Sequence, residues 1–167
     1  MRSIALLLWI WAISALAATP WEVYLELPTP ENAARVRAIE YTAPVEGGYN
    51  ADDLRLLESQ VRAADSQAFR LAYRLYIKSD GGLAEELGVM LGQVTRAHPT
   101  FFLQQVSALK IECSSLKWAL NSPGIEYVDR LSAQTYEITQ RRKALESVKA
   151  KNLATVRDHC LKQFERP

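Results

Sequence analysis

The chain has 167 residues, of which 49% are apolar and 23% charged, and its formal net charge is +1. This composition is that of an ordinary globular protein with enough residues for one domain and a hydrophobic core, and it excludes a disordered or low-complexity chain. Nucleic acid is not expected as a partner, because the first residues predict export from the cytoplasm and no recognised nucleic-acid-binding motif is present.

Residues 1–17 have the pattern of a secretory signal peptide. Arg2 precedes an apolar run over residues 4–13, and Ala15 and Ala17 have the A-x-A spacing of a signal-peptidase site. The run is shorter than the roughly 20 apolar residues that span a bilayer, so an uncleaved anchor is the less favoured alternative. We therefore expect cleavage near Ala17, a mature chain without a stable membrane span, and a periplasmic or secreted protein of the bacterial envelope.

Residues 18–28 are predicted to form a short extended arm. Within it, residues 21–27 alternate between apolar and polar side chains, which is typical of a strand with one buried face. No second strand is predicted, so an arm lying across helices is favoured over a sheet, and a strand offered to a partner is the alternative. Trp21, Tyr24 and Leu25 would also share one face of a helical turn. Trp21 and Tyr24 are candidate binding residues.

Residues 29–124 show the apolar spacing of successive helices, which we expect to pair as helical hairpins. The first helix begins with Thr29 as its N-cap, Pro30 at its first position and Glu31 in its first turn. Turn signals rich in glycine and proline separate the later helices. The fold class predicted for residues 18–167 is therefore a single all-α domain with about seven helices.

A weak internal repeat with a period of 33 residues extends over residues 50–109. With this shift, Leu54 aligns with Leu87 and Phe69 aligns with Phe102. Such a period is typical of stacked helical hairpins, and the segment weakly resembles HEAT-like units. Two amphipathic helix pairs of equal length would give the same pattern, so that alternative stays open.

Residues 125–167 are predicted to form the C-terminal helices. Residues 139–167 contain eight basic and three acidic side chains, whereas residues 19–65 contain four basic and nine acidic ones. The favoured interpretation is that the two regions compensate each other within the fold, and the alternative is a basic surface for an anionic partner. The candidate binding residues for that surface are Arg141, Arg142 and Lys143.

Cys113 and Cys160 are the two cysteines of the chain. In an oxidising compartment an even number of cysteines predicts a disulfide bond, and two free thiols or a metal pair with His159 are the alternatives. The spacing matches no zinc motif. We expect a Cys113–Cys160 disulfide, no metal site and no cofactor.

The sequence contains none of the catalytic motifs G-x-S-x-G, H-E-x-x-H or C-x-x-C, and no glycine-rich phosphate loop. His98 is expected to be a helix cap or surface residue. Tyr73 and Tyr76 have the helical spacing of core residues, and because buried hydroxyls need partners, they are also candidates for the rim of a binding groove.

The leading functional hypothesis is therefore a non-catalytic, exported protein of the cell envelope that binds a protein or peptide partner, as an adaptor or inhibitor. Helical stacks offer broad concave surfaces for such partners. One alternative is an envelope hydrolase that uses a single glutamate at the base of a deep pocket. The other alternative is a structural protein that associates with itself.

Overall fold

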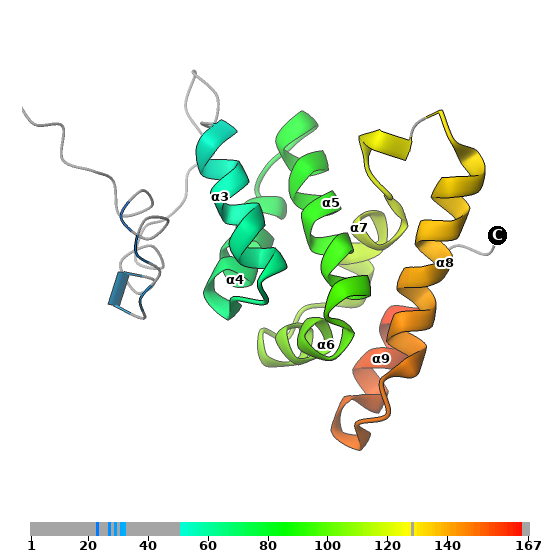
Figure 1. Cartoon of the computed structure of the whole chain (residues 1–167). Coiled ribbons are helices and arrows are strands. Elements are labelled where there is room, and N and C mark those ends of the chain that lie inside the picture. The colour runs from blue at the N-terminus through cyan, green and yellow to red at the C-terminus, as the bar shows by residue number, and fades with distance from the viewer. Residues whose placement is uncertain are drawn as a thin grey trace, which may run out of the picture.

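The computed structural model describes residues 51–127 and 129–164, together with positions 23, 27, 29, 31 and 32. The described part is all-α (Figure 1). Its α-helices are α3 (Ala51–Arg62), α4 (Ser66–Tyr76), α5 (Gly81–Ala97), α6 (Pro99–Ala108), α7 (Lys117–Asn121), α8 (Leu131–Ser147) and α9 (Ala154–Leu161). Three short 3-10 helices join them, namely η1 (Cys113–Leu116), η2 (Ile125–Tyr127) and η3 (Lys151–Leu153).

Two predictions for the N-terminal region lie outside the described residues. These are the signal peptide at residues 1–17 and the candidate binding residues Trp21 and Tyr24. Within the part of the chain that the structure describes, no helix is both long and apolar enough to cross a membrane.

The isolated positions before α3 show helical turns. The backbone N–H of Asn32 donates to Oγ1 of Thr29 at 3.2 Å, which confirms Thr29 as an N-cap. The backbone N–H of Leu27 donates to the carbonyl of Val23 at 3.0 Å, and Val23 is itself helical. At Val23 the structure is therefore helical where an extended arm was predicted, and apart from Val23 and Leu27 the predicted arm at residues 18–28 lies outside the described residues. An alternating segment without a partner strand cannot pair its backbone groups across a sheet, whereas a helical turn pairs them locally.

The N-terminus of helix α4 is capped by the side chain of Asp65. Oδ1 of Asp65 accepts hydrogen bonds from the backbone N–H groups of Gln67 at 2.9 Å and Ala68 at 2.7 Å. The buried face of α4 carries Phe69, whose ring meets those of Phe101 and Phe102 edge-to-face at centroid distances of 5.8 and 6.0 Å. These rings join α4 to α6.

Helix α5 lies in the middle of the described structure. It contacts α3 and α4 on one side, α7 and α8 on the other, and also α6 (Figure 1). The two aligned pairs named above, Leu54 with Leu87 and Phe69 with Phe102, are buried in one core. The likeness to HEAT-like units stays a prediction, because burial of these positions is expected for any packed amphipathic helices.

The predicted disulfide is confirmed. Cys113 at the start of η1 is bonded to Cys160 on α9, with their Cα atoms 4.9 Å apart and a sequence separation of 47. Both cysteines are buried among apolar side chains. The bond therefore ties the last helix to the middle of the chain and closes a loop that contains α7, η2 and α8.

Candidate functional site

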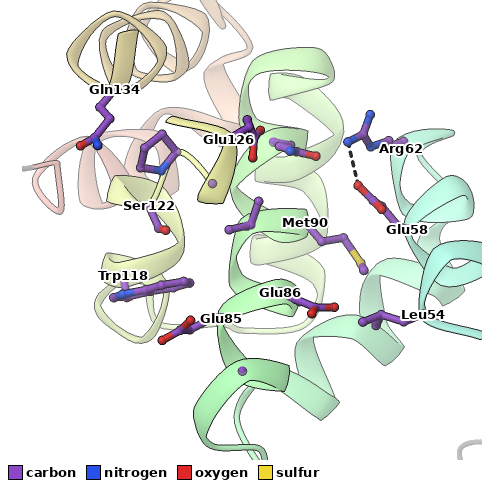
Figure 2. A pocket seen from close by; sticks show the side chains of 15 residues that line it. Leu54, Glu58, Arg62, Glu85, Glu86, Met90, Trp118, Ser122, Glu126 and Gln134 are labelled. Atoms are coloured by element: carbon purple, nitrogen blue, oxygen red, sulfur yellow. Dashed lines mark hydrogen bonds and ion pairs between the residues drawn. The ribbon is translucent and has the colours of Figure 1, made fainter. Parts of the chain in front are cut away.

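A groove with a volume of about 840 Å³ runs along α5. Its floor is formed by α5 itself, with Met90 near its centre (Figure 2). One wall is α3, which contributes Leu54 and Arg62, and the opposite wall is formed by α7 and η2, which contribute Trp118 and Glu126. The groove thus lies between the two groups of helices that α5 joins.

Two glycines on α5 allow the α7 wall to lie close to the floor. A Cβ atom built on Gly88 would lie 2.2 Å from Cζ3 of Trp118, and one built on Gly92 would lie 2.1 Å from the carbonyl oxygen of Ala119. Residues four apart share one face of a helix, so both glycines face α7. Trp118 consequently lies against the backbone of α5, and the residue stays 43% exposed at the edge of the groove.

The groove combines apolar and acidic side chains. Val89 and Trp118 are its partly exposed apolar residues, with buried Leu54 and Met90 beneath them. The charged lining residues are one guanidinium and four carboxylates, namely Arg62, Glu58, Glu85, Glu86 and Glu126. Because Nη2 of Arg62 is paired with Oε1 of Glu58 at 2.7 Å, the exposed carboxylates of Glu85 and Glu126 give the groove an excess of negative charge.

A second hollow of about 510 Å³ continues the groove toward the end of α5. It shares Arg62, Gln93 and Glu126 with the first, and Arg96 and Glu137 line its far side. Glu137 is the buried carboxylate of this region, and its two oxygens accept hydrogen bonds from Arg96 and from Arg141.

Arg141 is fully buried, so its predicted place on an exposed basic surface is wrong. Its guanidinium donates to Oε1 of Glu137 at 3.1 Å and to the carbonyl oxygens of Ala119 and Ser122 at 3.0 and 2.8 Å. These carbonyl oxygens lie at the C-terminal end of α7 and have no backbone N–H donor within the helix. The guanidinium of Arg141 supplies the hydrogen bonds instead, which explains why a cation is buried here. Burial lowers the pKa of Arg141, and the neighbouring carboxylate of Glu137 opposes this by raising it.

The other predicted basic residues lie on the outside of α8 and do not line the groove. Arg142 is partly exposed and pairs with Glu146 at 3.1 Å, and Lys143 is exposed. The basic stretch at 141–143 is therefore divided between the core and the surface, as the rotation of about 100° per residue along a helix requires.

Tyr73 and Tyr76 are half-buried on α4 and pack against the core, outside the groove along α5. The hydroxyl of Tyr73 lies 3.2 Å from Oγ of Ser115. Burial raises the pKa of Tyr76, while a backbone hydrogen bond at Ala119 lowers it to a lesser extent. Both tyrosines thus join α4 to the η1–α7 segment, and the aromatic residue at the groove is Trp118.

His98 occupies the N-cap position of α6, as expected for a cap residue. Its Nε2 atom lies 3.0 Å from the carbonyl oxygen of Arg62, so the side chain joins the end of α3 to the junction between α5 and α6. This contact fixes the α3 wall of the groove relative to its floor.

Among the residues that the structure describes, no three histidine, cysteine, aspartate or glutamate side chains converge to hold a metal ion. Comparisons of the chain with protein-family models, with curated proteins and with solved structures found no match. Exposed carboxylates beside an apolar floor are suited to holding a ligand through burial and charge.

Proposed function

We propose that this chain is an exported helical binding protein that holds a segment of a partner protein in the groove along α5. The observation that carries the proposal is the groove itself, in which partly exposed Val89 on the floor and Trp118 on the α7 wall lie near exposed carboxylates. Apolar groups at the centre and charged groups at the rim are the usual arrangement of a protein-binding surface.

The length of the groove fits a peptide segment better than a small metabolite. Helix α5 has 17 residues, which corresponds to about 25 Å at 1.5 Å per residue. The two hollows follow this helix from Gly82 to Ala97. An amphipathic helix lying in such a groove is one of the recurring modes of peptide recognition.

Export is supported by two independent features. The first 17 residues have the pattern of a signal peptide, and Cys113 and Cys160 are paired as a disulfide. The proposed place of action is therefore the periplasm or the extracellular space of a bacterium.

The hydrolase alternative has less support. Glu85, Glu86 and Glu126 are exposed at the edges of the groove, whereas a lone catalytic acid needs a secluded position beside the bond that it cleaves. Glu137 is secluded, but both its oxygens are engaged by arginines. Self-association remains the alternative that the experiment has to separate.

Site-specific photo-crosslinking in an expressing cell tests the proposal. A photoreactive residue replaces Val89 in the groove, and the matched control replaces exposed Ser114 on η1. We expect position 89 to crosslink one partner protein through one contiguous segment, and position 114 not to do so. The same background from both positions would contradict the proposal, and crosslinks only to copies of this chain would support the self-association alternative.

A further inference from the structure

We infer that the segment held in the groove along α5 is a cationic amphipathic stretch of a second protein, with lysine or arginine side chains beside apolar ones. This inference rests on the proposed function and adds the chemistry of the partner. It is carried by the charge of the groove and by the position of Trp118.

The carboxylates surround the groove instead of forming a single cluster. Glu58 lies on α3, Glu85 and Glu86 lie on α5, and Glu126 lies on η2, so both walls and the floor contribute. Within the described part of the chain, Glu85 and Glu126 are exposed and form no ion pair, and Glu126 interacts with the buried Arg141 only through its charge. A cationic segment would reduce the repulsion between these carboxylates, whereas an acidic segment would increase it.

Trp118 provides a contact that is selective for cations with long alkyl stems. Its ring lies over Gly88, which is one helical turn from Glu85 on α5. Figure 2 shows Trp118 and Glu85 at the same end of the groove. An exposed indole with a nearby carboxylate favours lysine or arginine, because the ring attracts the cation and packs against its methylene groups.

Other segments of this chain, and a second copy of it, are less suitable occupants of the groove. Residues 18–50 contain five acidic and two basic side chains, so their charge has the same sign as that of the groove. A second copy could offer its basic C-terminal surface, but Arg141 is buried there and Arg142 and Arg157 are already paired with Glu146 and Asp158. These contacts reduce the basic charge that a second copy can offer through its arginines, and the occupant inferred here is a different protein.

The test uses the mature, disulfide-bonded chain and two synthetic peptides of about 18 residues, the length of a stable amphipathic helix. Both peptides carry the same leucines at helical spacing, and their polar faces carry either lysine or glutamate. Binding is measured by fluorescence anisotropy at about 0.05 M and about 0.5 M salt, because salt screens exposed charges. The groove variant is Glu85→Gln/Glu126→Gln, and the control is Glu112→Gln, an exposed carboxylate outside the groove.

We expect the lysine peptide to bind at least about tenfold more tightly than the glutamate peptide at low salt, with most of the difference lost at high salt. The groove variant should weaken binding of the lysine peptide about fivefold or more, and the control should change it less than about twofold. Equal binding of the two peptides, binding of neither, or an unchanged affinity in the groove variant would each overturn the inference.

The outcomes also separate this inference from the proposed function. A neutral or acidic partner segment crosslinked at position 89 would leave the binding function in place and overturn the cationic assignment. A dimer of this chain that both the lysine peptide and the Glu85→Gln/Glu126→Gln variant dissociate would assign the groove to a second copy, and would overturn the inference as well.

Discussion

The guanidinium of Arg141 on α8 occupies the space that Gly92 leaves open on α5. A Cβ atom at Gly92 would lie 2.3 Å from Nη1 of Arg141 and 2.1 Å from the carbonyl oxygen of Ala119. The same Nη1 atom donates to that carbonyl at 3.0 Å. One glycine and one arginine thus hold α5, α7 and α8 together, and neither can change without affecting the other.

Replacing Gly92 by alanine is expected to lower the free energy of unfolding by about 1–3 kcal/mol, because the clash with Ala119 involves backbone that cannot simply rotate away. The control is Gly82→Ala in the first turn of α5, where no atom of the described structure lies within 4 Å of the added Cβ. It should stabilise the helix by about 0.5–1 kcal/mol. Urea denaturation of both variants measures the difference, and equal effects would refute the close packing of α5 and α7.

Replacing Arg141 by methionine is expected to destabilise the fold by about 3–5 kcal/mol, since it leaves Oε1 of Glu137 and the carbonyls of Ala119 and Ser122 buried without this donor. Arg142→Met removes the neighbouring, partly exposed ion pair with Glu146 and should cost less than about 1 kcal/mol. Denaturant unfolding compares the two. A large loss in Arg142→Met alone would show that the surface arginine matters more than the buried one.

Loss of the disulfide is expected to reduce stability by about 2–4 kcal/mol, because the bond restricts a long loop of the unfolded chain. The double variant Cys113→Ala/Cys160→Ala should show a lower Tm than the oxidised parent. Adding a reductant should lower the Tm of the parent and leave that of the double variant unchanged. A parent Tm that does not respond to reductant would contradict a stabilising role for the bond.

The raised pKa of Tyr76 predicts a loss of stability at alkaline pH. The unfolded chain releases this proton at a pH of about 10 and the folded chain only at a higher pH, so the contribution is complete below that pH and falls above it. Tyr76→Phe should therefore show a smaller decrease in unfolding free energy between neutral and alkaline pH. Tyr136→Phe, an exposed position on α8, is the control and should follow the parent.

Cleavage of the N-terminal segment tests the predicted export of the protein. Expression in a bacterium is expected to yield a periplasmic or secreted chain that begins shortly after Ala17, as determined by intact mass and N-terminal sequencing. A chain that retains residues 1–17 and fractionates with the membrane would contradict cleavage. In that case the alternative of an uncleaved anchor would replace it.

Short-range signals in the sequence predicted the all-α fold, the Thr29 cap and the disulfide. Apolar residues at helical spacing, such as Leu54 and Leu87, do lie in the core, because an amphipathic helix has one face to bury wherever it packs. The pairing of Cys113 with Cys160 followed from there being two cysteines. Predicting these features does not require knowing which helices pack against each other.

The candidate site could not be predicted in the same way, because it depends on contacts between distant segments. Arg141 stands in a run of three basic residues and is typical of a surface in sequence, yet carbonyls about twenty positions away make its burial favourable. The place of Trp118 at the groove depends on Gly88 in another helix. A pair of glycines four apart in α5 was the available signal for this close helix packing, and it indicates a contact without naming the partner helix.

The central position of α5 limits how this protein can vary in length during evolution. In an array of repeats, a unit can be duplicated or lost with little effect on the others, since each unit contacts only its neighbours. Here α5 contacts α3, α4, α6, α7 and α8, so removing any helix pair would expose part of its surface. Insertions and deletions among relatives of this chain should therefore fall in the connecting segments, and the helix order from α3 to α8 should be inherited as one unit.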